Sequence, residues 1–578
     1  MFLPGKDMQG PGGGISSIRQ SLSLKSIRGI LKRSAALYPS NVALRARKPD
    51  GGFLEITYLD LQADVRRIIG GLVRAGIEPG DKVAILSENR PEWVESYLAL
   101  ASMCAAIVPL DTQLKLQEIR HILQDSGARA IIVSEAFREL ACEASKRLFP
   151  EKLVLSMQSF SVLRECQEGE GSAINIHPED LAVLIYTSGT TGSSKAVMLS
   201  NLNIASNVDS LFQTIYFDQK DKFLSVLPLH HTFEATCGML LPLSVGASVT
   251  YTRSLKSREI IEDIRDSRAT ILIGVPLLFE KMHRGILRAI KDKSWFTRAA
   301  FSASLGLVKS IQALAGNHSG EFIFQGLRRK AGLSSIRLMF SGGAPLNMEV
   351  GEGLRRLGLP LLQGYGLTET APVLTVNVAN DNLASVGPSI PGVDIKILKP
   401  DANGTGEIAA SGPNIMMGYY NNEAATEDAF LEGWFLTGDL GFLDEEGCLF
   451  ITGRAKNVIV SAAGKNIYPE EIETQLLKSP FISEVLVVGD KNLQSGREDV
   501  SAIIYPNYEQ LDEYESRHQI KLKEVAVEDL LRQEIRRECK NLADYKRVKN
   551  FSIRDEEFPK TTTRKIKRSL FAEKKVEV

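Results

Sequence analysis

Cysteine is scarce in this chain, and the cysteines that occur form neither a metal pattern nor a disulfide pattern. Six cysteines are spread over 578 residues, at positions 104, 142, 166, 237, 448 and 539, and none belongs to a C-x-x-C pair. The seven histidines include the adjacent pair His230 and His231 but no H-x-x-x-H pattern. These absences argue against a zinc or disulfide scaffold and indicate the reduced thiols of a cytoplasmic protein.

Long apolar runs, a signal peptide and an excess of charge are missing as well. The longest apolar stretch, residues 97–110, has about 14 residues, fewer than the ~20 that span a bilayer. Residues 1–15 are rich in Gly and Pro and lack the apolar core of a signal peptide, so we expect them to be disordered. The net charge of −1 gives no support for nucleic-acid binding.

The composition that remains is that of a folded soluble protein. The chain is 44% hydrophobic and 24% charged. At 578 residues it is too long for a single core, so we expect two or more domains.

One stretch is suited to bind an anion. Residues 181–186 are apolar and predict a buried strand, and residues 187–193, which follow, are only Gly, Ser or Thr. Glycine permits turns in which successive N–H groups converge, and Lys195 adds a positive charge, so the stretch suits a nucleotide triphosphate. It is not a P-loop, because Gly192 and Lys195 are not adjacent. A flexible linker is the alternative, and the apolar residues 196–199 argue against it.

Strand and helix patterns alternate along most of the chain and predict an α/β fold with a mostly parallel sheet. Strands are expected at residues 53–58, 82–86, 130–133, 222–226, 247–251 and 270–273, and helices at 59–76 and 201–216. Short strands with Gly/Pro turns over residues 385–420 predict a small β subdomain. A second alternation follows, with strands at 456–460, 484–489 and 500–505 and helices at 469–478 and 522–540.

Two basic helical segments have two interpretations each. Residues 16–36 predict a basic amphipathic helix, and residues 281–335 predict long basic helices interleaved with aromatic residues. A solvated surface helix is the favoured interpretation of both, and contact with a membrane surface is the alternative.

Several further motifs accompany the Gly/Ser/Thr loop. They span residues 227–234, 341–345, 363–369, 433–439, 453–459 with 464–473, and 558–568. Each alone is also typical of a turn, a core aromatic or a solvated tail. Together and in this order, they resemble the adenylate-forming superfamily of acyl-CoA synthetases, adenylation domains and luciferases, from about residue 30 to the C-terminus. Residues 88–93, Glu234 and the basic insertion before residue 341 are most similar to long-chain fatty acyl-CoA synthetases.

The resemblance implies a domain organisation. A large N-terminal domain of layered α/β subdomains, with a small β subdomain, would be followed by a mobile small α+β C-terminal domain. We expect a disordered segment at 1–15, the large domain at 16–454 with a basic helical insertion at 281–335, and the C-terminal domain at 455–578. The hinge between the domains would be Lys456.

The resemblance also implies a two-step reaction. A fatty acid carboxylate attacks the α-phosphate of ATP, giving acyl-AMP and pyrophosphate, and the thiol of coenzyme A then takes the acyl group and releases AMP. The first step joins two anions, so it requires positive charge and Mg²⁺. Acyl carrier protein is an alternative thiol acceptor, and a non-catalytic nucleotide- or acyl-binding protein is an alternative of a different class. We expect a cytoplasmic location, and peripheral attachment to the inner face of a membrane is the alternative.

The ATP-binding residues follow from the matching motifs. The phosphate loop would comprise Thr187, Ser188, Gly189, Thr190, Thr191, Gly192 and Lys195. The adenine and ribose site would comprise Gly342, Gly343, Ala344, Gly364, Tyr365, Asp439 and Arg454. Tyr365 would stack on adenine, and Asp439 with Arg454 would hold the ribose hydroxyls, because a carboxylate accepts two hydrogen bonds and arginine donates from a fixed fork.

Four residues would carry the chemistry. Glu369 would bind Mg²⁺, Thr368 the α-phosphate, and His231 would lie near the acyl carboxylate, with a hydrogen-bonded core histidine as the alternative. Lys565 would bridge the carboxylate and the α-phosphate. The neighbouring His230 is assigned no role.

The second step would use another face of the C-terminal domain. Rotation about Lys456 would withdraw Lys565 and bring Gly464, Lys465 and Asn466 to the acyl-AMP. Two departures from the family pattern accompany this assignment: Arg564 and Ala196 stand where the family usually has glycine. Burial of the acyl chain contributes ~0.8 kcal/mol per methylene, which favours a long tunnel. Phe233 and residues 274–276 are candidate wall residues, with ordinary core packing as an equal alternative.

Overall fold

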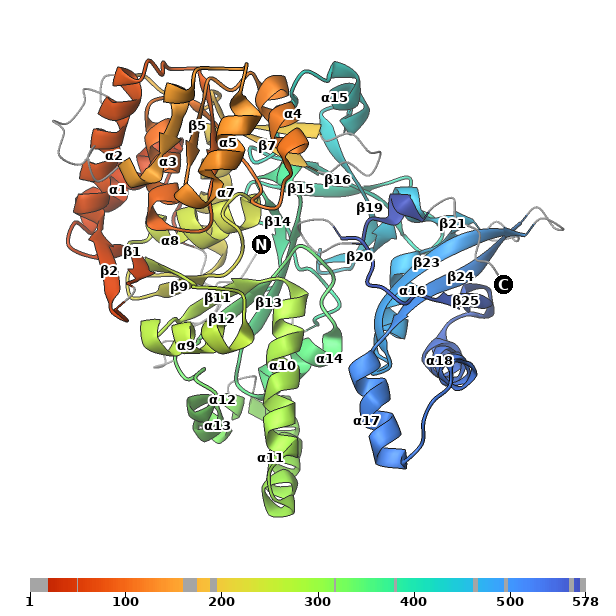
Figure 1. The fold of residues 1–578 in the computed structure, drawn as a ribbon. Coiled ribbons are helices and arrows are strands. Elements are labelled where there is room, and N and C mark those ends of the chain that lie inside the picture. Colours follow the sequence, from red (N-terminus) through yellow and green to blue (C-terminus); the bar gives the residue numbers. More distant parts are fainter. Residues whose placement is uncertain are drawn as a thin grey trace.

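The computed structural model describes residues 19–48, 50–159, 174–187, 195–315, 319–378, 382–460, 466–492, 497–560 and 566–571. Figure 1 shows two large sheets, a smaller sheet beside them, and a C-terminal lobe. The mixed α/β architecture agrees with the fold class that the sequence predicts.

The first large sheet holds the Gly/Ser/Thr loop between two of its strands. Its seven strands lie in the order β17-β8-β7-β4-β3-β5-β6. Strands β3 to β7 are parallel, whereas β8 is antiparallel to both of its neighbours. The bounds are β3 Lys82–Leu86, β4 Ala106–Pro109, β5 Ala130–Val133, β6 Val154–Ser156, β7 Leu181–Thr187, β8 Lys195–Ser200 and β17 Gly418–Tyr419. The central strands are apolar on both faces because helices cover each side.

The second large sheet has eight strands, in the order β14-β13-β12-β11-β9-β10-β1-β2. The pairs from β1 to β13 are parallel, and the outermost strand at each edge is antiparallel to its neighbour. The bounds are β1 Val42–Arg47, β2 Phe53–Thr57, β9 Lys222–Ser225, β10 Ser248–Tyr251, β11 Ile271–Gly274, β12 Leu338–Ser341, β13 Leu361–Gly366 and β14 Val373–Val376.

Helices lie between the two sheets and on their outer faces. Helix α3 contacts β3 and β4 of the first sheet and β1 of the second, so the two sheets share one helical layer and one core cluster. Helices α4 and α5 pack on the outer face of the first sheet, and α9, α10 and α14 on that of the second. The helices of this part are α1 Ile27–Leu37, α2 Tyr58–Arg74, α3 Pro91–Ser102, α4 Leu116–Ser126, α5 Arg138–Ser145, α7 Asn201–Thr214, α8 Leu241–Ser244, α9 Ser257–Ser267, α10 Pro276–Lys291, α11 Trp295–Ala315, α12 Ser319–Ile323, α13 Gln325–Lys330 and α14 Met348–Arg356. A π-helix spans Glu234–Leu240.

A small β sheet follows, in the region where the sequence predicts one. Strands β15, β16, β19 and β18 pair in that order, and β20 pairs with β19. The bounds are β15 Asp394–Leu398, β16 Gly406–Ser411, β18 Phe430–Leu431, β19 Trp434–Leu443 and β20 Leu449–Arg454, with α15 Glu423–Ala429 between β17 and β18.

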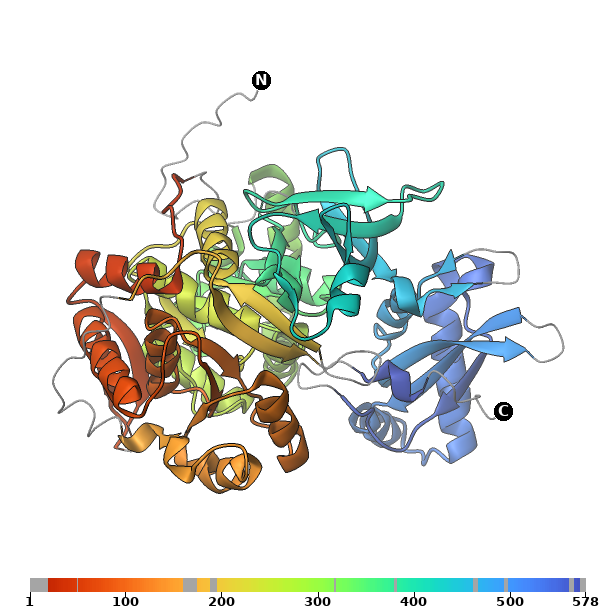
Figure 2. The ribbon, with the colours of Figure 1, turned by 90° about the horizontal axis from the view of Figure 1, so that it is seen from above.

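The C-terminal lobe packs around core clusters of its own and stands beside the main body (Figure 2). It contains β21 Ile459–Val460, β22 Asn466–Ile467, α16 Pro469–Leu476, β23 Ile482–Asn492, β24 Arg497–Pro506, α17 Tyr508–His518, α18 Glu524–Glu538 and β25 Asn550–Ile553. The predicted strand at 456–460 is wrong over its first half, since a 3-10 turn spans Ala455–Asn457. Helix α17 and strand β25 were not predicted. Helix α17 is polar, with one buried residue, Leu511, so it lacks the apolar periodicity that predicts a helix.

The N-terminal helix is shorter than predicted. It begins at Ile27 because the Ser26 hydroxyl caps it by accepting a hydrogen bond from the Gly29 amide at 3.1 Å. Residues 19–26 have no helix, and Arg19 donates to the carbonyl of Phe217 at 2.7 Å. Arg33 likewise donates to the carbonyl of Ser244 at 3.0 Å. These basic side chains therefore bind the body of the protein, in agreement with the surface-helix interpretation.

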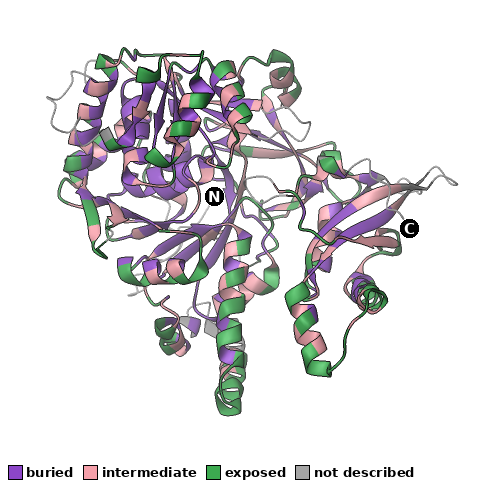
Figure 3. Cartoon of the chain, viewed as in Figure 1, coloured by how far each residue is buried: buried purple, intermediate pink, exposed green. Residues whose placement is uncertain are grey.

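The basic insertion projects from the body as an exposed helix, α11 (Figure 3). Trp295 and Phe296 at its start are 61% and 66% exposed, and their rings stack 3.7 Å apart. Phe301 and Phe324 instead pack against each other at 5.5 Å within the second core cluster. Among the described residues, none of the helices combines the length and the apolarity that crossing a bilayer requires.

Candidate active site

The described ends of the Gly/Ser/Thr loop face each other across a β hairpin. Thr187 closes β7, Lys195 opens β8, and the Thr187 hydroxyl donates to the Lys195 carbonyl at 3.3 Å. Ser188, Gly189, Thr190, Thr191 and Gly192 lie outside the described residues, so their phosphate contacts stay predictions.

The strand that leads into this loop is anchored by the residue before Thr187. Its side chain, Tyr186, donates a hydrogen bond to Asp125 at 2.6 Å, which ties β7 to α4. Burial and this carboxylate raise the pKa of Tyr186, so the phenol stays a donor across the physiological range.

Tyr419 links two of the predicted residues. Its hydroxyl donates to Glu369 Oε1 at 3.0 Å, and Lys195 Nζ lies 4.6 Å from the centre of its ring. Strand β17, which carries Tyr419, pairs with β8, which carries Lys195. Burial, followed by the charge of Glu369, raises the pKa of Tyr419 and keeps it neutral. An ammonium and a carboxylate are thereby placed on one aromatic side chain.

The turn that holds Thr368 and Glu369 is fixed by backbone hydrogen bonds. It is a 3-10 turn over Thr368–Thr370, directly after β13. The carbonyl of Glu369 accepts from the Met416 amide at 2.8 Å, and the Asn414 amide group donates to the Thr370 carbonyl at 2.8 Å. A Cβ on Gly366, just before the turn, would lie 1.8 Å from the carbonyl oxygen of Pro372, so only glycine fits there.

The predicted ribose residues meet at one carboxylate. The buried Asp439 accepts from the Tyr365 hydroxyl at 2.7 Å and pairs with Arg454 Nε at 2.8 Å. Asp439 and Arg454 are direct partners in the β19–β20 ladder. Burial and the charge of Asp439 raise the pKa of Tyr365 well above its usual value. The structure thus brings together three of the seven predicted nucleoside residues.

The glycine-rich segment after β12 packs against residues 226–233, which carry His230 and His231 and are called the histidine loop below. A Cβ on Gly342 would lie 2.9 Å from the ring of Phe233, two residues after His231. Gly343 has φ +82°, a conformation that favours glycine. Gly364, on β13, would bring a Cβ to 3.2 Å from the Thr375 carbonyl. Small residues here let Phe233 and the neighbouring strands approach closely, and Ala344 follows them in the same loop.

The loop that carries His231 is held by Asn89, which follows β3. The Asn89 amide donates to the Leu227 carbonyl at 2.6 Å and to the Ser225 hydroxyl at 3.1 Å. Its oxygen accepts from the Leu229 amide at 2.9 Å. One side chain of the first sheet therefore positions the loop at the end of β9 in the second sheet.

The C-terminal lobe contributes its predicted residues only in part. Lys456 lies exposed in the 3-10 turn, and Asn466 starts β22. Gly464, Lys465 and Lys565 lie outside the described residues. The two residues that flank the segment of Lys565, Lys560 and Ile566, form an antiparallel bridge.

Salt bridges anchor the same tail on the C-terminal lobe. Lys560 pairs with Glu484 and, at 2.8 Å, with Glu557. Arg568 pairs with Glu473 and donates to the Val487 carbonyl at 3.2 Å. The described residues before and after the segment of Lys565 therefore both bind the lobe.

Two residues that hold parts of the candidate site, Tyr419 and Asn89, were given no role in the sequence analysis. Tyr419 lies in a Gly-Tyr-Tyr segment, and it is the one aromatic residue of a strand that is only two residues long, Gly418–Tyr419. Asn89 directly follows the buried strand 82–86 and a Ser-Glu dipeptide, at the carboxyl end of a parallel strand, where ligand sites of α/β sheets gather.

Comparison with known proteins places the chain in a broad group of ligases. A family model described as AMP-binding enzyme matches residues 31–420. A long-chain-fatty-acid–CoA ligase of Mycobacterium tuberculosis is 30% identical over 473 residues, 76% of this chain and 76% of the relative. A 4-coumarate–CoA ligase of Humulus lupulus is 29% identical over 550 residues, 90% of this chain and 89% of the relative.

Solved structures share the fold over nearly the whole chain. ATP-bound MatB of Rhodopseudomonas palustris has a TM-score of 0.75 at 25% identity and covers 95% of this chain and 98% of its own. The o-succinylbenzoate coenzyme A synthetase of Bacillus subtilis, in complex with ATP and a magnesium ion, has a TM-score of 0.73 at 24% identity, covering 93% and 98%.

Proposed function

We propose, since this chain belongs to the AMP-binding enzyme family, that it joins a long-chain fatty acid to coenzyme A through an acyl-AMP intermediate. At the coarser level the chain is an ATP-dependent acid–thiol ligase of the AMP-forming class. The observation that best supports the proposal is the arrangement of Lys195 and Glu369 on the shared Tyr419.

In the first step the charges of ATP must be neutralised where pyrophosphate leaves. Lys195 starts β8 at the end of the Gly/Ser/Thr loop, and we expect its ammonium to bind the β- and γ-phosphates. The ring of Tyr419 holds this ammonium in position before ATP arrives. Preorganised charge of this kind stabilises the developing negative charge without reorganisation at the moment of reaction.

Glu369 fits the requirements of a magnesium ligand. Its Oε1 accepts one hydrogen bond from Tyr419, and a carboxylate is the ligand type that Mg²⁺ prefers. Bound Mg²⁺ would supply positive charge between the phosphates. Tyr419 itself orients the carboxylate and, as a neutral phenol, leaves its negative charge intact.

Asp439 would hold the ribose. In the structure its two oxygens bind Tyr365 and Arg454. Ribose hydroxyls would join or replace these partners, and Arg454, 41% exposed at its side chain, is free to turn toward the nucleotide. Tyr365 would keep its ring against adenine, with Gly342, Gly343, Ala344 and Gly364 along the same site.

The second step requires the C-terminal lobe to turn. We place the hinge at Lys456, between a large domain of residues 16–454 and a small one of 455–578. Lys565 would serve adenylation, and Gly464, Lys465 and Asn466 would face the acyl-AMP when the thiol attacks. A hinge of few residues suffices for such a motion.

For the acid, the apolar surroundings of the histidine loop support a fatty chain. A small cavity between the two sheets is lined by apolar residues such as Tyr97, Ile185 and Leu199, together with His230 and Thr232. The cavity has room for no more than one water, so a fatty chain requires its apolar walls to move apart. Each methylene that is then buried would contribute ~0.8 kcal/mol, which favours long chains.

The proposal is tested by the release of AMP and pyrophosphate with a panel of acids. The panel runs from short to long saturated fatty acids and includes 4-coumarate, each with coenzyme A, without a thiol, or with acyl carrier protein. We expect the highest kcat/KM with long-chain acids and coenzyme A. A preference for 4-coumarate contradicts the proposed fatty acid substrate. Release of AMP only with acyl carrier protein contradicts coenzyme A as the acceptor, and no release under any condition contradicts the proposed adenylation.

We also propose that the start of α11 rests on a membrane surface, where fatty acids partition. Trp295 and Phe296 are exposed side by side, and Lys291 and Lys293 precede them. Aromatic and basic side chains together suit an anionic interface. The wild type should sediment with anionic vesicles, and the double variant Trp295→Ser/Phe296→Ser should stay in the supernatant. Equal sedimentation of both proteins with the vesicles contradicts this membrane contact.

A further inference from the structure

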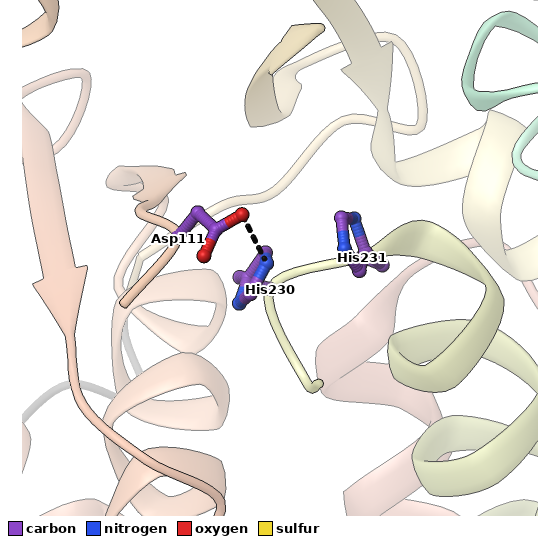
Figure 4. Close-up of side chains that lie close together, drawn as sticks. All are labelled: Asp111, His230 and His231. Atoms are coloured by element: carbon purple, nitrogen blue, oxygen red, sulfur yellow. Dashed lines mark ion pairs between the residues drawn. The ribbon is translucent and has the colours of Figure 1, made fainter. Parts of the chain in front are cut away.

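Two side chains of the histidine loop lie close to one side chain that follows a strand of the first large sheet (Figure 4). They are Asp111, two residues after β4, and the adjacent pair His230 and His231. One ligand atom from each lies within 4.8 Å of the others. Asp111 is 9% exposed and His230 is 7% exposed, so two of the three are shielded from bulk water.

The fold holds these side chains in place before any ligand arrives. Asp111 Oδ1 accepts from the Gln113 amide at 2.8 Å, which leaves Oδ2 directed at His230. The histidine loop is fixed by Asn89, and the His231 amide donates to the Pro228 carbonyl at 3.1 Å. The cluster is therefore preorganised by backbone contacts from both sheets.

The contact between Asp111 and His230 has the spacing of two ligands on one metal ion. Asp111 Oδ2 and His230 Nε2 are 3.3 Å apart, and within the described residues Nε2 of His230 has no partner that meets hydrogen-bond geometry. Ligand atoms about 2.0–2.1 Å from a tetrahedral ion lie roughly 3.3–3.4 Å from each other. The ring centres of His230 and His231 are 4.2 Å apart and the three ligand atoms lie within 4.8 Å of one another, so His231 supplies the third ligand after a side-chain rotation.

We propose that Asp111, His230 and His231 bind one divalent transition-metal ion such as Zn²⁺. Two imidazole nitrogens and one carboxylate form the donor set of three-ligand zinc sites, in which the fourth position stays open. Imidazole ligands select Zn²⁺, Co²⁺ and related ions, whereas Mg²⁺ takes oxygen ligands. The site is thus chemically distinct from the magnesium site proposed at Glu369.

The ion would control the ligase, a consequence that rests on the proposed function. His231 is the residue expected at the acyl carboxylate, and a bound ion would occupy its nitrogen. Zn²⁺ should therefore inhibit formation of acyl-AMP, while Mg²⁺ remains required.

Binding is tested directly, without turnover. The full chain, treated with chelator and freed of ATP, is titrated with Co²⁺ and followed by visible absorption, and with Zn²⁺ by calorimetry. We expect one equivalent and the intense bands of tetrahedral Co²⁺, with no displacement by millimolar Mg²⁺. Asp111→Asn and His230→Gln should each weaken binding at least about 100-fold, since loss of even an outer-shell partner costs 10–100-fold. His518→Gln, at an exposed histidine of the C-terminal lobe, should bind as the wild type does.

Circular dichroism and the unfolding temperature show whether each variant folds. His230→Ala, read out with Co²⁺ in the same way, keeps the test valid if His230→Gln is unfolded. Absence of a tetrahedral Co²⁺ spectrum in the wild type, or equal binding by His230→Gln and His518→Gln, overturns the metal site. Because these readouts need neither acid nor ATP, they are independent of whether the chain proves to be a fatty acid ligase.

Discussion

At the scale of single residues, Tyr419 contacts both Lys195 and Glu369, which we propose to bind the phosphates and Mg²⁺. Tyr419→Phe keeps the ring beneath Lys195 but removes the hydrogen bond to Glu369. Hydrogen bonds to a charged group contribute about 1.5–3 kcal/mol, so we expect kcat/KM for ATP to fall roughly 10- to 100-fold. Pyrophosphate release at varied Mg²⁺ and ATP measures the effect.

The adjacent tyrosine offers a matched control for this measurement. The ring of Tyr420 lies 5.1 Å from Lys82 Nζ, away from Glu369, so Tyr420→Phe should leave kcat/KM unchanged. If Tyr419→Phe also stays within about twofold of the wild type, the hydroxyl has no part in orienting the carboxylate.

Glu234 makes stability depend on pH. It is 1% exposed in the π-helix, and Gly238 leaves room for its carboxyl group, since a Cβ there would lie 2.5 Å from the carboxyl carbon. Burial raises its pKa to about 8. Between pH ~4.5 and ~8 the unfolded chain loses the proton that the folded chain keeps, so this group's contribution to stability falls as pH rises.

Glu234→Gln should remove that dependence. As pH rises through this window, the unfolding free energy of the wild type should fall relative to that of the variant by about 1.4 kcal/mol per pH unit. The difference between the two proteins should level off above pH 8. Unfolding temperatures of both proteins from pH 5 to pH 9 provide the comparison. A gap that stays constant across this range contradicts a protonated Glu234.

At the scale of elements, the two large sheets are connected by Asn89. Asn89→Ala leaves the Leu227 carbonyl and the Leu229 amide without their hydrogen bonds. Each unsatisfied group costs about 1–3 kcal/mol, so the unfolding temperature should fall by several degrees. Adenylation should slow as well, because His231 loses its fixed loop. As a control, Asn175→Ala, at an exposed residue, should change neither the unfolding temperature nor the rate of adenylation. If Asn89→Ala loses stability but keeps full activity, the contacts of Asn89 do not position His231.

Sequence patterns predicted elements well where burial creates periodicity. The strands at 82–86 and 130–133 match β3 and β5 residue for residue, because both are apolar and central. Helix α17 has a single buried residue, so hydrophobic periodicity does not mark it, and strand β25 alternates polar and apolar residues over only four positions. The helix predicted at 16–36 began too early, because a cap at Ser26 and contacts of Arg19 with the body outweigh local amphipathicity.

In the candidate site, too, local sequence motifs predicted some residues, whereas others are brought together only by the tertiary fold. Asp439 and Arg454 are predicted from motifs, and the β19–β20 ladder pairs them. Tyr419 and Asp111 come from segments far from their partners in sequence, and only the sheet order brings them to Glu369 and His230. Motif spacing carries no information on such long-range contacts.

At the scale of the whole molecule, the C-terminal lobe should separate the two half-reactions. The described residues on either side of the Lys565 segment bind the lobe, Lys560 through Glu484 and Arg568 through Glu473, so we expect Lys565 to move with the lobe. Lys565→Ala should stop acyl-AMP formation, with at least a 100-fold loss in pyrophosphate release. Thioester formation from supplied acyl-AMP should stay largely intact. Lys567→Ala, at an exposed neighbour, should affect neither step, and equal loss of both steps in Lys565→Ala contradicts its assignment.

Rotation of that lobe should depend on the backbone freedom of one exposed turn. Lys456 lies in the 3-10 turn over Ala455–Asn457, which the Asn457 side chain connects to Glu470 of α16 by a hydrogen bond at 2.6 Å. Proline fixes φ near −65° and restricts the preceding residue, so Lys456→Pro should hold the lobe in one orientation. We expect pyrophosphate release to persist while thioester formation falls at least 10-fold. Lys456→Ala, which keeps the backbone free, should support both steps, because the proposed role belongs to the backbone at this position and not to the ammonium. Rapid-quench measurement of acyl-AMP and acyl-CoA separates the steps, and full thioester formation by Lys456→Pro would place the hinge elsewhere.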